Sequence, residues 1–240
     1  MSENNRKMLI GGITMDFLGF ANSDFDFFKK KSSLNKPEYD ERKEEVKRHF
    51  REFCYQIQKD YHSTTNKTLV LDKDFQGLSK NKNSVLAKCM VDSINYMGLH
   101  LVLSQDNITV NLVCPPEDEY SKFEDLKNAI INKKEIFVRF FKENKNMFLI
   151  LYKRISKKTG DDIWEEEFKF DNNELSLGNY QVLLENIIKL QPYPPENKKN
   201  AGLNIRTQFS KSDAVKIGRQ LPARVCLEIN KFLGLCENLK

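Results

Sequence analysis

The stretch from Leu99 to Phe170 constrains the fold more than any other part of the chain, because its apolar residues follow strand periodicity. Apolar residues alternate with other residues from Leu99 to Leu103 and again from Ile108 to Cys114, and polar residues 105–107 separate the two runs. Two alternating runs around a short polar connection are typical of a β-hairpin. The sequence therefore predicts antiparallel sheet at this point.

A three-stranded meander is predicted after the hairpin. Its strands are expected at Ile136 to Phe141, Met147 to Tyr152 and Ile163 to Phe170, with short polar links between them. Between the hairpin and the meander, apolar residues from Tyr120 to Ile131 fall at helical spacing, after two prolines that end the preceding strand. We expect one antiparallel sheet with this helix on one face.

Further helices are predicted before and after this region. Ser23 is a candidate N-cap for a short Phe-rich helix, and a long helix with one buried apolar stripe is expected to begin near Pro37. Residues 68–71 suit a short strand, whereas residues 85–96 fit a helix or a strand equally well. Residues 174–190 are expected to form a helix with an apolar face.

The 240 residues are expected to form one domain with an appendage. The proline-rich segment from Gln191 to Asn200 is the best boundary, so we predict a core domain over residues 1–191 and a helical arm over residues 192–240. Ser210 is expected to cap the first helix of the arm, and Pro222 to open the second. The predicted class is α+β: an antiparallel sheet of about five strands, an N-terminal helical segment and a C-terminal helical arm.

Composition favours a folded protein of the cytoplasm. Hydrophobic residues make up 40% of the chain and charged residues 30%, an ordinary balance for a globular protein. The five cysteines are odd in number and form no CxxC pair, and no signal peptide or membrane-length apolar run is present. We expect cytoplasmic localisation, free thiols, no contact with a membrane, and no metal or cofactor needed to hold the fold.

The first half of the chain is expected to contain, in order, a Phe-rich helix, a short polar link with an asparagine and an aromatic residue, a long charged helix and a basic loop. The residues concerned are Gly19-Phe20, Phe27-Phe28, Asn35, Tyr39 and Leu78 to Ser84. Over about residues 15–155 the chain thereby resembles a bacterial family of conserved hypothetical proteins of unknown function. In the loop the family's arginines are absent, and Asp72, Lys73 and Asp74 stand near their place. The resemblance implies an α+β fold and no established activity.

Basic residues concentrate in the predicted arm. From Pro195 to Lys240 nine lysines and arginines stand against four acidic residues, an excess of +5 that equals that of the whole chain. Two short helices separated by residues 218–222 could form a helix-turn-helix-like unit that lies along the phosphates of nucleic acid. The alternative is that these helices cap the sheet and expose a basic face to solvent. The residues expected to contact nucleic acid are Lys80, Lys82, Arg206, Lys211, Lys216, Arg219 and Arg224.

A restriction-type nuclease site is the alternative interpretation. Glu167 and Lys169 form a Glu-x-Lys triplet on a predicted strand, and Asp162 precedes it. Nucleases of this type hold Mg²⁺ with two carboxylates and place a lysine near the attacking water. Strand alternation also places Glu167 and Lys169 on a solvent face, opposite a core face with Trp164 and Phe168. An ordinary solvated strand surface is therefore the favoured interpretation of the triplet.

Three functions remain open at this point. The first is a non-enzymatic cytoplasmic binding module whose basic arm contacts nucleic acid or an acidic protein partner, and a prokaryotic or phage defence setting would suit it. The second is the nuclease, with Mg²⁺ as its cofactor. The third is a structural protein that forms homo-oligomers. The sequence contains no HExxH, P-loop, GxGxxG or GxSxG motif, and its three histidines share no ligand spacing.

Overall fold

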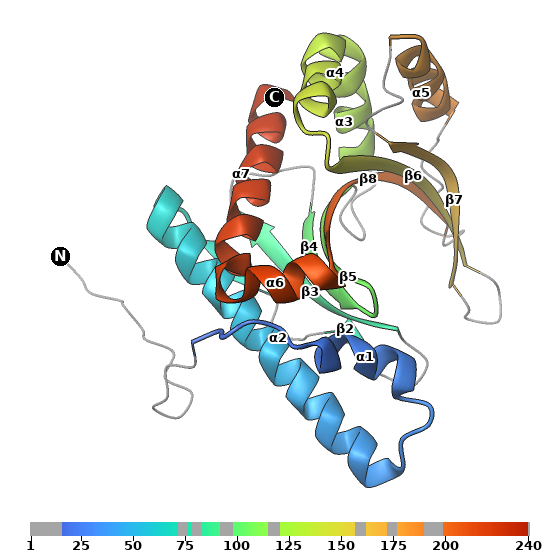
Figure 1. Ribbon diagram of the computed structural model, residues 1–240. Helices are drawn as coiled ribbons and strands as arrows, with labels where there is room; N and C mark the ends of the chain where they lie inside the picture. The colour runs from blue at the N-terminus through green and yellow to red at the C-terminus, as the bar shows by residue number, and fades with distance from the viewer. Residues whose placement is uncertain are drawn as a thin grey trace.

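The computed structural model describes residues 16–71, 76–77, 83–91, 98–114, 121–156, 162–171, 177–189 and 199–239. Its elements form an α+β fold in which one antiparallel sheet packs against helices (Figure 1). The elements are α1 (Asn22–Lys30), α2 (Lys36–Thr65), β1 (Leu69–Leu71), β2 (Gln76–Gly77), β3 (Ser84–Val91), β4 (Gly98–Ser104), β5 (Asn107–Cys114), α3 (Ser121–Asn132), α4 (Lys134–Glu143), β6 (Met147–Ser156), β7 (Asp162–Asp171), α5 (Leu177–Lys189), β8 (Lys199–Ser210), α6 (Lys211–Ile217), the 3-10 turn η2 (Gly218–Gln220) and α7 (Leu221–Leu239).

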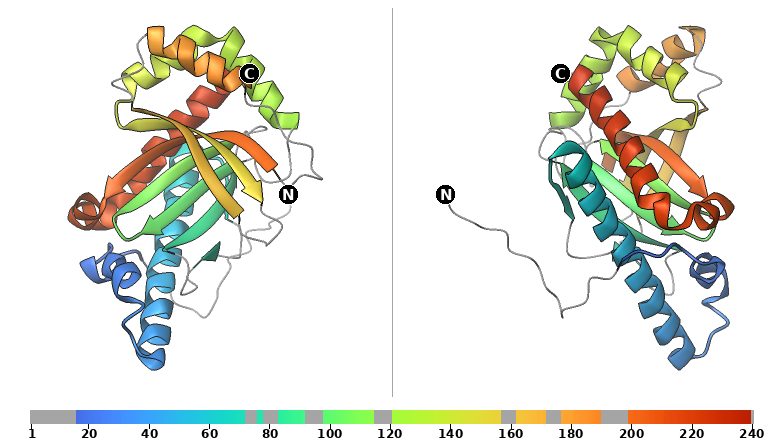
Figure 2. Two further views of the ribbon diagram at one scale, coloured as in Figure 1. Left: turned by 90° about the vertical axis from the view of Figure 1, so that its right-hand side faces the viewer. Right: turned by 60° about the vertical axis from the view of Figure 1, so that its left-hand side comes forward.

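The sheet is larger than predicted. In the described ranges it has eight strands rather than about five, in the order β1-β3-β4-β5-β8-β6-β7, with β2 also paired to β3. The sheet twists strongly along its length (Figure 2). The predicted hairpin is confirmed as β4 and β5, and the last two strands of the predicted meander are confirmed as β6 and β7. The first part of segment 85–96, which fitted either helix or strand, belongs to β3, and residues 92–96 lie outside the described residues.

The predicted strand from Ile136 to Phe141 is wrong, because these residues belong to helix α4. A short continuous apolar run has no decisive period, so a buried strand and a buried helix are equally consistent with it. Phe137, Phe140 and Phe141 recur at helical spacing and are all buried, with the rings of Phe137 and Phe141 5.1 Å apart. Packing on one side of a helix explains their burial better than alternation does.

The predicted division between a core and an arm also differs from the structure. β8 lies within the sheet: Arg206 pairs with Asn111 of β5 on one side and with Phe148 of β6 on the other. Helix α7 lies beside α2 (Figures 1 and 2), and Cys226 Sγ is 3.4 Å from the carbonyl oxygen of Ile57. Residues 199–239 therefore complete the same sheet and core as the rest of the described chain.

Helix α1 begins two residues earlier than Ser23 suggested. Its N-cap is Ala21, whose N–H donates to a carboxylate oxygen of Asp24 at 2.8 Å. The other oxygen of Asp24 lies 2.8 Å from Nδ1 of His49 on α2. Because Asp24 is completely buried, this carboxylate fixes both the start of α1 and its position against α2.

Helix α2 forms where the sequence predicted it. Asn35 is its N-cap, and a capping box with Glu38 satisfies two backbone N–H groups, with Pro37 in the first turn. The predicted apolar stripe is confirmed, since all of its residues are buried: Val46, Phe50, Phe53, Cys54 and Ile57. Among the helices that the structure describes, none is both long and apolar enough to cross a membrane.

Candidate functional site

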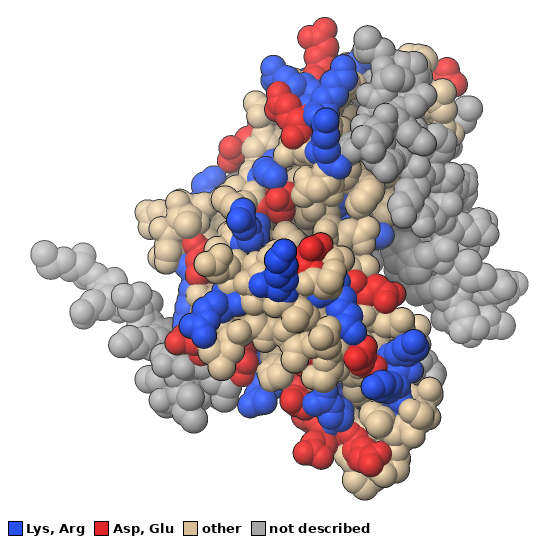
Figure 3. Space-filling view, viewed as in Figure 1, with Lys and Arg blue, Asp and Glu red and all other residues tan. Residues whose placement is uncertain are grey.

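Three of the predicted basic residues lie together at the junction of α6 and α7. Lys216, Arg219 and Arg224 are exposed, and none has an ion-pair partner among the described residues. We call these three residues the basic corner. Figure 3 shows blue side chains over α6 and the beginning of α7, with a few red ones between them. The corner therefore presents cationic groups to solvent.

Local geometry makes this corner rigid. Ser210 caps α6, as predicted, by accepting a hydrogen bond from the N–H of Asp213 at 3.1 Å. Gly218 ends α6 with a φ of +59° and starts the turn into α7. Gly19 packs against this turn so closely that a Cβ on Gly19 would lie 3.0 Å from the Cα of Gly218. These contacts hold the backbone that carries the corner's three basic residues.

Lys211 has a structural partner. Its Nζ lies 2.6 Å from Oδ1 of Asp26, so it joins α6 to α1. The hydrogen bond from Lys211 lowers the pKa of Asp26, and the charges of Lys211, Lys30 and Lys29 lower it further. Lys29 and Lys30, at the end of α1 beyond Asp26, are also exposed, and the sequence did not suggest them.

Arg206 does not belong to the basic corner. It lies in the middle of β8, where its Nε donates to Oδ1 of the buried Asn111 at 2.7 Å. Lys88 of β3, His100 of β4, Asn111 of β5 and Arg206 are paired in one row across the sheet. The side chains of Lys88, His100 and Arg206 are all partly buried. Its engagement with Asn111 in the sheet makes it a poor contact for a phosphate backbone. The predicted contacts Lys80 and Lys82 lie outside the described residues.

The nuclease triplet has unsuitable spacing. β7 is continuous from Asp162 to Asp171, so the Cα atoms of Asp162 and Glu167 are about 16 Å apart. Mg²⁺ holds oxygen ligands at about 2.1 Å, so two coordinating oxygens lie at most about 4 Å apart. These two carboxylates are therefore too distant to share one ion. The search of the described residues found no group of three or more His, Cys, Asp or Glu that could hold a metal.

The pairing of β7 with β6 contains a β-bulge. The register shifts at Glu167, because Phe168 pairs with Leu151 whereas Glu166 pairs with Tyr152. Period-two alternation is interrupted at an extra residue of this kind. The side chains of β7 lie outside the described set, so the predicted core and solvent faces of this strand stay a prediction.

The described cysteines are core residues, as the sequence suggested. Cys54, Cys89, Cys226 and Cys236 are free and buried, and the side chain of Cys114 lies outside the described set. Burial raises the pKa of Cys226 to about 12 and raises the pKa values of Cys54 and Cys89 as well. These three thiols stay protonated at neutral pH and are poor nucleophiles.

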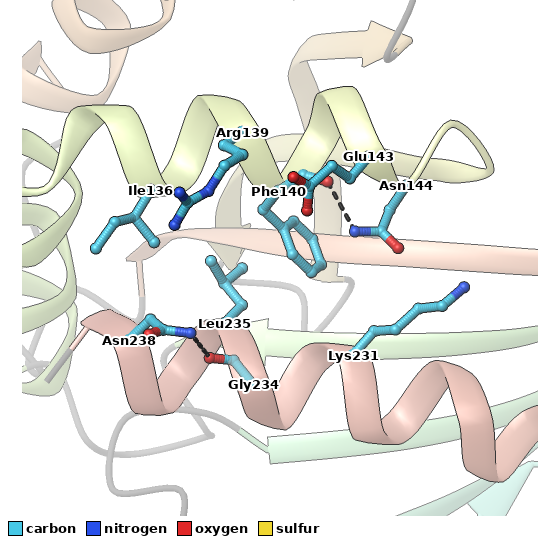
Figure 4. Close-up of a pocket in the computed structure, with 9 residues that line it drawn as sticks. All are labelled: Ile136, Arg139, Phe140, Glu143, Asn144, Lys231, Gly234, Leu235 and Asn238. Atoms are coloured by element: carbon cyan, nitrogen blue, oxygen red, sulfur yellow. Dashed lines mark hydrogen bonds between the residues drawn. The ribbon is translucent and has the colours of Figure 1, made fainter.

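A groove between α4 and α7 is a second candidate site that the sequence did not reveal (Figure 4). Its volume is about 170 Å³. Ile136 and Phe140 point from α4 toward α7, Leu235 points back toward α4, and Gly234 leaves the groove floor open. The lining residues are Ile136, Arg139, Phe140, Glu143, Asn144, Lys231, Gly234, Leu235 and Asn238. The α4–α7 groove thus has apolar side walls and a polar rim.

Comparison with protein-family models found no match, and a search of curated proteins found none either. These comparisons assign neither a family nor an activity. The resemblance over residues 15–155 and the defence setting stay predictions, and the functional argument depends on the geometry of the two sites.

Proposed function

We propose that the protein is a non-enzymatic binding module that contacts the phosphate backbone of nucleic acid through the basic corner. The observation that supports this proposal is the set of three exposed basic residues within nine positions around the turn from α6 into α7, none with an ion-pair partner in the part of the chain that the structure describes. Exposed charges that already have partners contribute little to binding a new anion, whereas unpaired ones can release condensed counterions from nucleic acid.

The contact set differs from that proposed from the sequence. Arg206 is occupied in the sheet and Lys211 is paired with Asp26, so the main contacts are Lys216, Arg219 and Arg224. The net charge of +5 adds long-range attraction to any polyanion. Binding through these groups should be insensitive to sequence, because phosphates are the same at every position.

A salt titration tests the proposal. The logarithm of the association constant for duplex DNA should fall with the logarithm of salt concentration, with a slope of about −2.7 for three phosphate contacts. Fluorescence anisotropy on two duplexes of unrelated sequence measures this slope. Arg219→Ala and Arg224→Ala should each reduce its magnitude by about 0.9, equally on both duplexes.

The matched control is Lys142→Ala, which removes an exposed lysine on α4 and should leave the slope unchanged. No binding at about 50 mM salt, or binding indifferent to both arginine variants, would refute the proposal. Binding of polyglutamate without binding of DNA would instead support an acidic protein partner. Mg²⁺-dependent cleavage that disappears in Glu167→Ala would favour the nuclease, and a concentration-dependent mass in light scattering would support the homo-oligomer.

We also propose a cytoplasmic location. Four free, buried thiols and an odd total of five cysteines support a reducing compartment. Mass spectrometry of unfolded, alkylated protein should find five modified thiols without prior reduction, and an intramolecular disulfide would contradict this.

A further inference from the structure

Gly234 is unexpected at its position in α7. It lies in the interior of the helix, five residues before Leu239, and its backbone φ is not in the left-handed region. Glycine is the least favourable helix-interior residue apart from proline. A Cβ built on Gly234 would meet no atom within 4 Å, so neither backbone conformation nor packing requires a glycine. What the glycine does provide is an open floor in the α4–α7 groove.

The open space has the size of one ring. The groove volume of about 170 Å³ is close to that of the roughly 150 Å³ protein cavity that binds benzene. Ile136, Phe140 and Leu235 supply apolar contacts on its two sides (Figure 4). An aromatic or branched aliphatic group would remove this surface from water.

The end of the groove near Asn238 is cationic. Arg139 points from α4 into the space above Leu235 and Asn238, and no ion-pair partner for it exists among the described residues (Figure 4). Lys133 adds a second positive charge at this end, where its Nζ donates to the carbonyl oxygen of Asn238 at 3.2 Å. A guanidinium with free donors is well suited to bidentate binding of a carboxylate.

The opposite end of the groove is closer to neutral. Glu143 lines it together with Lys231, and Nζ of Lys231 lies 2.9 Å from an oxygen of the mostly buried Glu228. Glu228 also accepts a hydrogen bond from Asn146 at 3.2 Å. The two ends of the groove therefore differ in charge, which gives a bound ligand one preferred orientation.

We propose that the α4–α7 groove binds a small carboxylic acid that carries one aromatic or branched apolar group. The apolar group lies over Gly234 between α4 and α7, and Arg139 binds the carboxylate. The proposal is independent of nucleic-acid binding, because the groove includes no residue of the basic corner.

Phenylacetate is a suitable probe, and binding to the full chain can be followed by amide chemical shifts. Phenylacetate should shift amides of α4 and α7 with saturation at millimolar concentration. Gly234→Ala should weaken binding about tenfold, because a methyl group then occupies the floor. The same variant should melt at an equal or higher temperature, since alanine favours the helix and meets open space. Loss of binding can therefore not be attributed to unfolding.

Two controls separate the charge from the ring. Arg139→Gln should weaken phenylacetate binding about fivefold, whereas binding of the neutral phenylacetamide should be the same in Arg139→Gln as in the original chain. Arg224→Ala should leave phenylacetate binding unchanged. The proposal is refuted if no shifts occur up to about 20 mM phenylacetate, or if Gly234→Ala binds it as well as the original chain does. Binding of peptides with a C-terminal Phe, without binding of phenylacetate, would also refute it and favour a protein tail.

Discussion

Replacing Asp24 with alanine should lower the free energy of unfolding by about 3 kcal/mol. The carboxylate is completely buried and makes two contacts of 2.8 Å, one to the N–H of Ala21 and one to Nδ1 of His49. Hydrogen bonds to a charged group contribute about 1.5–3 kcal/mol each, so together they contribute about 3–6 kcal/mol. Ala21 is exposed and the His49 side chain is 23% exposed, so both regain water in the variant. The lower end of the range therefore applies.

Urea unfolding followed by circular dichroism measures this loss. Asp24→Asn keeps an oxygen for the N–H of Ala21, so it should lose about half as much stability as the alanine variant. Glu41→Ala removes the same charge from an exposed position on α2 and should change stability by less than about 0.5 kcal/mol. A loss below about 1 kcal/mol in Asp24→Ala, or equal losses in the two Asp24 variants, would show that this carboxylate does not hold α1 to α2.

Two further predictions concern the corner turn and the buried thiols. Gly19→Ala should cost more than about 2 kcal/mol in urea unfolding, because residue 19 has a φ of +113° and its Cβ would press on the backbone of Gly218; a neutral result would mean that the turn can move. Because the pKa of Cys226 is raised in the folded protein, above about pH 9 the unfolded chain loses a thiol proton that the folded chain retains. The free energy of unfolding therefore falls as pH rises, by about 1.4 kcal/mol per pH unit for each such thiol. Urea midpoints between pH 8 and 10 should show a shallower decline in Cys226→Ala, and identical declines would contradict the argument.

Elements with their own local signals could be predicted from the sequence. The hairpin of β4 and β5 has alternation and a polar turn, and α2 combines Asn35, Pro37 and a stripe with helical spacing. Ser210 satisfied the sequence criteria for an N-cap, and it caps α6. In each case residues that are close in sequence determine the structure, so no knowledge of distant contacts was needed.

Elements that depend on distant partners could not be predicted in this way. The pairing of Asn111 with Arg206 joins residues 95 apart, and the hydrogen bond from Lys211 to Asp26 joins residues 185 apart. No local pattern reports such a pairing, so β8 was placed in an arm and Lys211 among the free cations. Gly234 was a visible signal, since a glycine interrupted a helical pattern. The groove that it opens depends on the facing helix α4, whose residues 136–141 the sequence predicts as a strand.

The position of β8 between β5 and β6 sets the order of events while the chain is being synthesised. Both neighbours leave the ribosome before residues 199–210, so each has an unpaired edge until β8 arrives. Open edges recruit strands from other chains, which makes the nascent protein most vulnerable to aggregation in this interval. A chain that stops at residue 198 would keep the edges of β5 and β6 unpaired. A separate peptide of residues 199–239 contains β8, so it could form the missing hydrogen bonds with both strands.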